Sequence, residues 1–145
     1  MFKTILVPTD GSPISETAIA AAIRFARQCD SKLVALSVAE PYPYSPLSEG
    51  AFLTDASQFQ ENMVRMAHAN VQKIADAAHA EGVACVTVVA QSFNPYEEII
   101  ETARAHQCDV IFMASHGRKG LNKLFVGSET QKVLAHSTLP VLVFR

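Results

Sequence analysis

Short apolar runs alternate with amphipathic stretches along the whole chain. Apolar runs of strand length that contain β-branched residues and end at turn-forming residues predict buried strands over Phe2–Thr9, Lys32–Ala39, Ala84–Ala90, Val110–Ala114 and Pro140–Phe144. Apolar residues at helical spacing predict helices between them, over Pro13–Cys29, Ser57–Glu81, Pro95–His106 and Ser128–Ala135. Strand and helix therefore alternate from one end of the chain to the other.

Cap-forming residues mark where two of these helices begin. Ser12 is expected to cap the first helix, with Pro13 in its first turn. Asn94 is expected to cap the third helix, with Pro95 as its first residue and the Glu97 side chain bonded back to the cap.

The longest predicted helix follows the only long irregular stretch, the proline-rich segment Glu40–Thr54, which we expect to be a surface loop. Gly82 supplies the stop at the end of this helix. Its inner face should carry the apolar residues Met63, Met66, Val71, Ile74 and Ala78.

The alternation of strands and helices predicts an α/β protein. Each strand pair needs a right-handed crossover, so the sheet should be open, parallel and covered by helices on both faces. We expect a single Rossmann-like sheet of five strands in the order 3-2-1-4-5. With 145 residues, 49% of them apolar, the chain is long enough for one compact domain and short for two, so residues 1–145 are expected to form a single domain.

Charge and cysteine content narrow the class of partner. A net charge of -2 with 18% charged residues provides no basic surface for nucleic acid, so we expect a small-molecule or protein partner. The first apolar run is too brief for a signal peptide or a membrane span. The three cysteines contain no CxxC pair, which favours reduced thiols and a cytoplasmic protein.

Polar residues gather where two predicted strands end. Asp10-Gly11-Ser12 follows the first strand, and Ser115-His116-Gly117 follows the fourth. In the order 3-2-1-4-5 these strands are neighbours and the chain reverses its winding direction between them, which is where open α/β sheets bind ligands. The two polar loops are therefore expected to line one binding site.

A glycine-rich pattern at the second loop indicates anion binding. Gly117 is followed by nine residues and then by Gly127-Ser128, which leads directly into a helix. Glycine allows close approach of the backbone, and the amino end of a helix attracts a phosphate. Glycines at such positions also serve simply to turn the chain, and the pattern alone leaves both interpretations open.

At this point the sequence resembles the universal stress proteins, and specifically their ATP-binding branch, whose signature is G-x-x-G, nine residues, then G-S or G-T. Gly117, the spacer, Gly127 and Ser128 match it, and the segments ILVPTDGS, NPYEEII, SHGRKGL and HSTLPVLVF extend the resemblance over the whole chain. The resemblance implies that the adenine and ribose lie against Pro8, Thr9, Asp10, Val38, Met113, Ala114 and His116. It further implies that backbone amides receive the phosphates at Gly117, Gly127, Ser128 and Glu129.

Two residues depart from the expected pattern. Ala114 stands where the signature has its first glycine. Its methyl group narrows the space in which a ribose or phosphate approaches the backbone, unless the backbone there is ordinary extended chain. Glu129 suits the helix dipole but repels a triphosphate at the same helix end. Arg118, Lys119 and Lys123 are candidates to offset that charge.

The resemblance implies a stress-response protein that binds ATP, ADP or AMP and forms a homodimer through the strand Val141–Phe144. Magnesium on the phosphates is part of this expectation, with Asp10 as the nearest helper, but no protein metal site and no catalytic residues are assigned. Two alternatives stay open. One is a slow ATP hydrolase in which Asp10 or His116 positions water, and the other is a dimeric interaction protein with a degenerate nucleotide site and an unknown protein partner.

Overall fold

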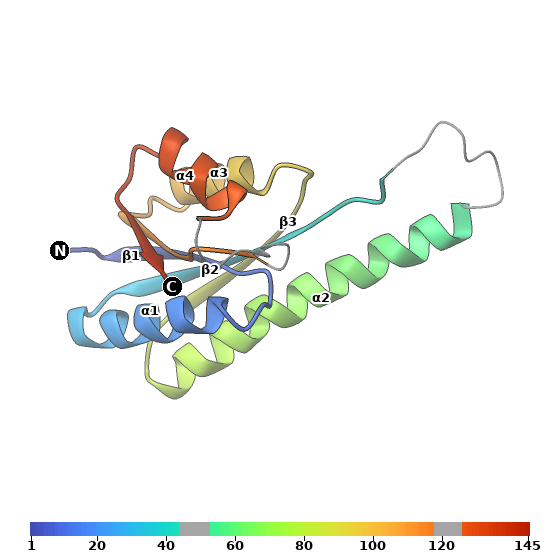
Figure 1. Cartoon of the computed structure of the whole chain (residues 1–145). Coiled ribbons are helices and arrows are strands. Elements are labelled where there is room, and N and C mark those ends of the chain that lie inside the picture. Colours follow the sequence, from blue (N-terminus) through green and yellow to red (C-terminus); the bar gives the residue numbers. More distant parts are fainter. Residues whose placement is uncertain (44–52, 118–125) are drawn as a thin grey trace.

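In the computed structural model, the described residues are 1–43, 53–117 and 126–145. They form a parallel five-stranded sheet in the order β3-β2-β1-β4-β5 (Figure 1), which confirms the predicted fold class and strand order. The strands are β1 (Thr4–Pro8), β2 (Lys32–Ala39), β3 (Cys85–Gln91), β4 (Val110–Ala114) and β5 (Val141–Phe144).

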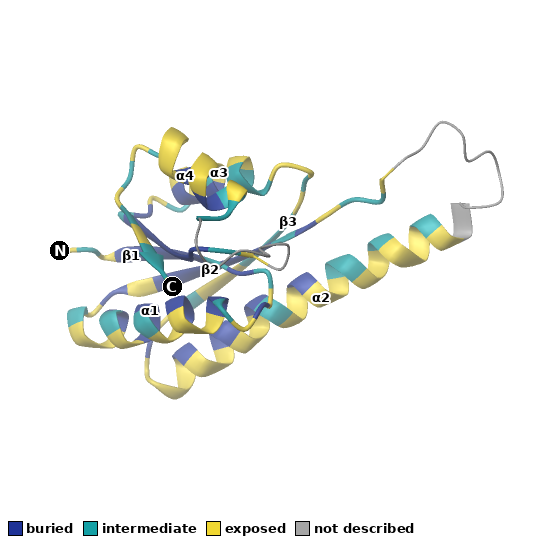
Figure 2. Ribbon diagram, viewed as in Figure 1, coloured by how far each residue is buried: buried dark blue, intermediate teal, exposed yellow. Residues whose placement is uncertain are grey.

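Helices cover both faces of the sheet, as the alternating pattern predicts. They are α1 (Ser15–Cys29), α2 (Leu53–Ala80), α3 (Pro95–Ala105) and α4 (Ser128–His136). The helices α1 and α2 lie on one face, and α3 and α4 lie on the other (Figure 1). Figure 2 shows the buried residues concentrated in the central strands and on the inward faces of the helices.

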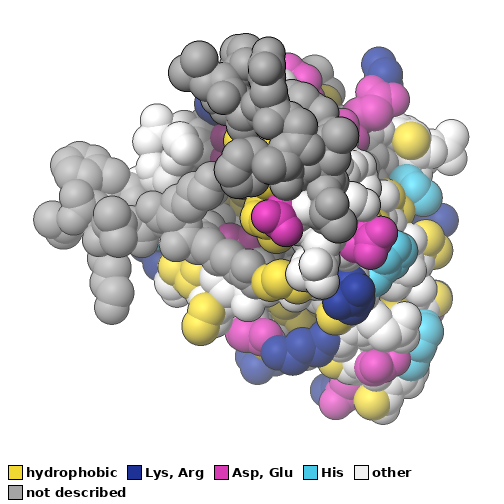
Figure 3. All heavy atoms as spheres, turned by 90° about the vertical axis from the view of Figure 1, so that its right-hand side faces the viewer, with side chains coloured by type: hydrophobic (Ala, Val, Ile, Leu, Met, Phe, Trp, Pro, Cys, Tyr) yellow, Lys and Arg dark blue, Asp and Glu magenta, His cyan; other side chains and the backbone are white. Residues whose placement is uncertain are grey.

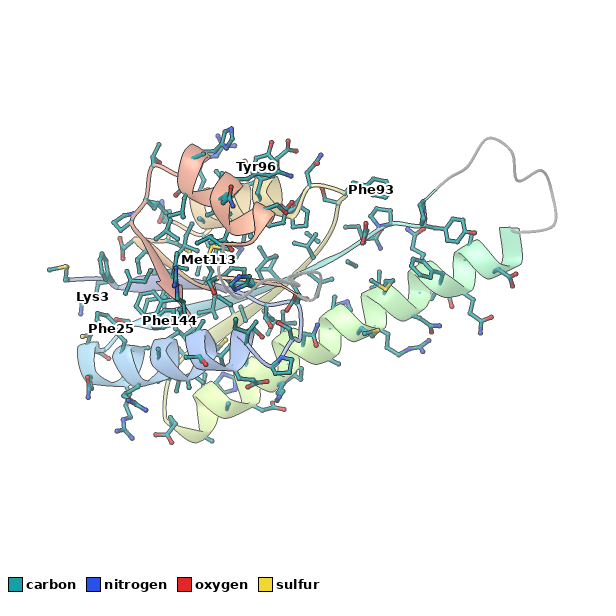
Figure 4. All side chains as sticks on the ribbon, viewed as in Figure 1. Lys3, Phe25, Phe93, Tyr96, Met113 and Phe144 are labelled. Carbon is teal, nitrogen blue, oxygen red and sulfur yellow. The ribbon has the colours of Figure 1, made fainter. Side chains whose placement is uncertain are left out.

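The sheet separates two hydrophobic cores because successive residues of a strand point to opposite faces. In β1, Ile5 and Val7 join the core beneath α1 and α2, whereas Leu6 joins the core beneath α3 and α4. Phe112 anchors the first core, with its ring centroid 5.6 Å from that of Phe25 and 5.5 Å from that of Phe144. Figure 4 shows Phe25 and Phe144 together on the α1 side of the sheet.

The predicted cap of α1 is wrong. The helix begins at Ser15, its cap position is Ile14, and no side chain caps it. Ser12 instead uses its backbone carbonyl, which accepts hydrogen bonds from the Ser15 N–H (3.1 Å) and the Ser15 hydroxyl (2.6 Å). A tight turn over Ser12–Ser15 therefore takes the place of the side-chain cap.

The long helix differs from its prediction at the amino end. It begins at Leu53 rather than Ser57, so the predicted loop Glu40–Thr54 is shorter at this end, and residues 44–52 of that loop lie outside the described residues. Met66 is 42% exposed and does not belong to the inner face. The stop at Gly82 is confirmed by its φ of +74° and by the Val83 N–H bonded to the Ala78 carbonyl at 2.8 Å.

The third helix has its predicted boundary but not its predicted cap. Asn94 occupies the cap position and Pro95 is the first residue, yet no cap side chain is bonded there. The Glu97 N–H donates to the Asn94 carbonyl at 3.1 Å. The helix end is instead capped from outside, since the Glu129 carboxylate accepts a hydrogen bond from the Tyr96 N–H at 3.0 Å.

Candidate functional site

Local hydrogen bonds fix the turn after β1, at the edge of the sheet where the strands have their carboxyl ends. The Thr9 N–H donates to the Leu36 carbonyl at 2.8 Å, which continues the pairing of β1 with β2. The Ser12 N–H donates to the Asp10 carboxylate at 2.9 Å, and Gly11 adopts a φ of +77° that glycine accepts without strain. The Asp10 carboxylate is thereby fixed beside the end of β1.

The structure brings the two predicted loops together. A Cβ atom added to Gly117 would lie 2.8 Å from Oδ2 of Asp10, so the Asp10 carboxylate lies directly against the Gly117 backbone. The strands β1 and β4 are paired neighbours, and both end at this edge (Figure 1). A side chain in place of the Gly117 hydrogen would occupy the space that Asp10 now fills.

Ser115, which the sequence analysis placed in the second polar loop without giving it a role of its own, connects three segments at this edge. It is completely buried. Its N–H donates to the Phe144 carbonyl at 2.7 Å, and its own carbonyl accepts a hydrogen bond from the Gly127 N–H at 2.7 Å. Its hydroxyl shares a 2.7 Å hydrogen bond with Nδ1 of His116. Ser115 therefore fixes the position of His116 and joins the start of the loop to its end.

Gly127 permits this close approach. A Cβ atom at this position would lie 3.2 Å from the Ser115 carbonyl oxygen and 3.3 Å from Cα of His116, which is tighter than ordinary contact. Gly127 is also the cap position of α4, with an extended backbone and no capping side chain. The glycine thus allows the amino end of α4 to lie directly against the loop that follows β4.

The polar side chains of the first turn of α4 point to partners elsewhere in the protein. The Thr130 hydroxyl donates to the Ala114 carbonyl at 3.0 Å, and the Gln131 amide donates to the Val126 carbonyl at 2.6 Å. The first N–H groups of a helix have no acceptor within the helix, and among the described residues none is supplied for Ser128 or Glu129. These N–H groups are donors suited to an anion.

The Glu129 carboxylate, in the first turn of α4, is bonded to α3 and to Lys132. Besides accepting the Tyr96 N–H, it forms an ion pair with Lys132 at 3.0 Å. Lys132 also lies 5.4 Å from the centroid of the Tyr96 ring, which Figure 4 shows between α3 and α4. The carboxylate that was expected to repel a phosphate is therefore held at the amino end of α3.

The remaining candidate residues lie along the strand ends. Pro8 and Val38 are half-buried in the neighbouring strands β1 and β2. Met113 and Ala114 are 6% and 8% exposed, so these side chains are packed inside the protein. Ala114 is a regular residue of β4 and is not among the residues with positive φ, so the backbone at this position does not require glycine.

The carboxyl edge combines acidic and apolar character. Figure 3 faces this edge and shows acidic and hydrophobic side chains side by side near the centre of the described surface. No cluster of three or more metal-ligand side chains occurs within residues 1–43, 53–117 and 126–145. Arg118, Lys119 and Lys123, the cations expected to offset negative charge, lie outside the described residues.

A cavity elsewhere on the surface is less suited to binding a phosphate. A cavity of about 460 Å³ lies at the opposite edge of the sheet, beside Lys3, Arg27 and Lys32. Two of these cations already have partners, since Lys3 Nζ donates to the Cys29 carbonyl at 3.3 Å and Arg27 pairs with Glu81 at 2.7 Å. The Lys3 contact completes the carboxyl end of α1, so this cavity offers less to an anion than the amino end of α4, where no acceptor among the described residues is supplied for the N–H groups of Ser128 and Glu129.

The strand order, the helices on both faces and the polar edge between β1 and β4 define a doubly wound α/β protein with its candidate site at the topological switch point. The chain belongs to the universal stress protein family, whose model matches residues 1–145. A universal stress protein of Thermus aquaticus is 32% identical over 145 residues, covering 100% of both chains. No described helix is both long enough and apolar enough to cross a membrane.

Solved structures share the fold over nearly the whole chain. The universal stress protein UspA from Lactobacillus plantarum gives a TM-score of 0.85 at 23% identity, over 99% of this chain and 97% of that one. A universal stress protein in complex with cAMP gives 0.71 at 24% identity, over 99% and 97%. The protein from Archaeoglobus fulgidus in complex with dAMP gives 0.68 at 15% identity, over 99% and 98%.

Proposed function

We propose that this universal stress protein binds an adenine nucleotide at the carboxyl edge of β1 and β4, as a member of the ATP-binding branch of its family. The base and ribose lie beside Pro8, Thr9, Asp10 and Val38, with Met113, Ala114 and His116 continuing the wall through the end of β4. The phosphates accept hydrogen bonds from the backbone at Gly117, Gly127, Ser128 and Glu129, with magnesium as their counterion.

One observation carries this proposal, namely the amino end of α4, where the N–H groups of Ser128 and Glu129 have no acceptor among the described residues and the neighbouring side chains are held in place. Thr130, Gln131 and Glu129 direct their side chains to β4, to the preceding loop and to α3, so the helix end is held in place before any ligand arrives. A fixed array of N–H donors binds an anion without an ordering penalty. The two relatives solved with cAMP and dAMP support the choice of an adenine nucleotide.

Substitution of Gly117 tests the location of the site. In Gly117→Val the added side chain meets the Asp10 carboxylate and fills the space between the two loops, so calorimetric titration with ATP and magnesium should show at least a tenfold loss of affinity, equivalent to about 1.4 kcal/mol. Gly117 is exposed, so the fold should persist.

Gly82→Val is the matched control, because it replaces a glycine at the opposite edge of the sheet. Its φ of +74° makes any side chain strained, so this variant should lose stability and keep its affinity. If wild type and Gly117→Val bind ATP with equal affinity, the nucleotide does not bind at this edge of the sheet.

We further propose that the protein is a cytoplasmic homodimer that presents its nucleotide state to a protein partner during stress. The strand β5 is the outermost strand of the sheet and lies next to β4 alone. Its Leu142 is 38% exposed. An apolar outer strand of this kind is usually covered by another segment, and the same strand of a second copy can pair with it.

A further inference from the structure

The Ser12 hydroxyl stands out in the turn between β1 and α1. Across residues 1–43, 53–117 and 126–145, its oxygen is the one buried side-chain polar atom without a hydrogen-bond partner. Ser12 is 6% exposed. Its backbone is fully engaged, because the N–H donates to Asp10 at 2.9 Å and the carbonyl accepts from the Ser15 N–H at 3.1 Å.

A buried hydroxyl without a partner is unfavourable in a folded protein. Removing such a group from water without a replacement bond costs about 1–3 kcal/mol, and folded proteins contain few cases. The neighbouring hydroxyls of the same turn are satisfied, since Ser15 bonds to the Ser12 carbonyl and lies 3.1 Å from the Thr9 hydroxyl. The exception at Ser12 therefore requires a partner that the described residues do not supply.

The position of Ser12 indicates where that partner comes from. Ser12 donates its N–H to the same Asp10 carboxylate that lies against Gly117, so it belongs to the contact between the two loops of the candidate site. Ser12 also lies in the turn just before α1, a helix of 15 residues that begins at Ser15, has Ile14 at its cap position and carries no side-chain cap. The amino end of a helix favours negatively polarised atoms. The contact with Asp10 places Ser12 at the candidate site, and the helix end favours an oxygen acceptor there.

We propose that the Ser12 hydroxyl is a hydrogen-bond donor to an oxygen atom of the bound nucleotide, forming a second ligand subsite at the amino end of α1. This inference rests on the proposed function. The acceptor is a ribose or phosphate oxygen, since both present lone pairs that a hydroxyl can bond. Ligand binding then supplies the partner that the described residues do not provide for this buried group.

Ser12→Ala tests this subsite because it should leave the stability of the free protein unchanged or raise it, and should lower the affinity for nucleotide. Without ligand, the variant should unfold at the same temperature as wild type or higher, since it removes an unsatisfied buried group. Its affinity for AMP should fall about three- to tenfold, the range of one net hydrogen bond. Titration calorimetry and thermal unfolding of the full chain measure both effects.

Ser31→Ala is the matched control. Ser31 is equally buried, but its hydroxyl donates to the Phe2 carbonyl at 2.5 Å at the other edge of the sheet. This variant should lose stability and keep its affinity for AMP. Comparison of adenosine with AMP identifies the acceptor, because an equal loss for both indicates ribose and a loss confined to AMP indicates phosphate.

Two outcomes overturn the subsite while leaving the proposed function intact. One is wild-type affinity of Ser12→Ala for both adenosine and AMP. The other is a free variant that is less stable than wild type, which would show that the hydroxyl already has a partner. If wild type itself binds neither adenosine, AMP nor ATP, the proposed function fails and the subsite fails with it.

Discussion

At the scale of single residues, the first turn of α4 has two roles. Its side chains hold the helix against β4 and α3, and the backbone N–H groups of Ser128 and Glu129 are donors suited to an anion. The sequence places Glu129 in this turn and predicts that its charge opposes a phosphate there. The structure holds the carboxylate on the Tyr96 N–H, 33 residues away in the chain. A contact at that separation has no local signal, so sequence patterns cannot predict it.

Glu129→Ala should weaken the attachment of α3 to α4. The change leaves the Tyr96 N–H without its acceptor, and loss of a helix cap costs about 0.5–2 kcal/mol, so urea unfolding should show a decrease of about 1 kcal/mol. Glu101→Ala, which breaks an exposed ion pair with Arg104, should change stability by less than about 0.5 kcal/mol.

Nucleotide affinity should not fall in Glu129→Ala, because the proposed contact uses the backbone of residue 129 and a like charge has been removed. An unchanged stability would contradict the capping role. A large loss of affinity would show that the carboxylate itself contacts the ligand.

The sequence predicts which residues lie close together because they follow neighbouring strands. It does not predict which residues connect segments through buried hydrogen bonds. Asp10 and Gly117 follow neighbouring strands, and the structure places them in contact. The sequence placed Ser115 in the second polar loop but gave it no role, and its hydrogen bonds to Phe144 and Gly127 become visible only in the structure. Which atoms contact a ligand remains a prediction.

At the scale of elements, the periodic signal located every strand and helix, while helix starts were less accurate. The bounds of β2 and β4 agree with the predicted ones, because an abrupt change from apolar to polar residues marks them. The starts of α1 and α3 involve a choice between side-chain and backbone acceptors. That choice depends on neighbouring elements, so the side-chain capping bonds predicted for both helices are absent, although Asn94 does occupy the cap position of α3.

Pairing of the strand beginnings should depend on pH through Asp109. Its carboxylate accepts hydrogen bonds from the N–H groups of Thr4 (2.9 Å) and Lys3 (2.7 Å), which tie the start of β4 to the start of β1. These bonds stabilise the charged form and lower the pKa of Asp109, with Thr4 contributing most.

A carboxylate with a lowered pKa in the folded state stabilises the protein above its unfolded pKa of about 3.9 and loses that effect as the pH falls through the folded value. The stability difference between wild type and Asp109→Asn should therefore be constant near neutral pH and shrink below about pH 4. Urea unfolding across this range measures it. A difference that stays constant at acid pH would contradict the assignment.

At the scale of the whole molecule, the alternation of strands and helices and the right-handed crossover predict a parallel sheet covered on both faces, whereas neither rule fixes the strand order or shows what covers the outer strands. If two copies pair through β5, light scattering should give twice the mass of one chain for wild type. Leu142→Arg, placed on the exposed part of this strand, should shift the protein toward monomer without unfolding it. A wild-type monomer at micromolar concentration, or a variant dimer as stable as wild type, would reject this interface.

The central claim concerns the edge where β1 and β4 end, and titration calorimetry of the wild-type protein with ATP and AMP, in the presence of magnesium, tests it most directly. Nucleotide binding should produce a saturable heat signal with one site per chain. No binding of either nucleotide at millimolar concentration would contradict the account.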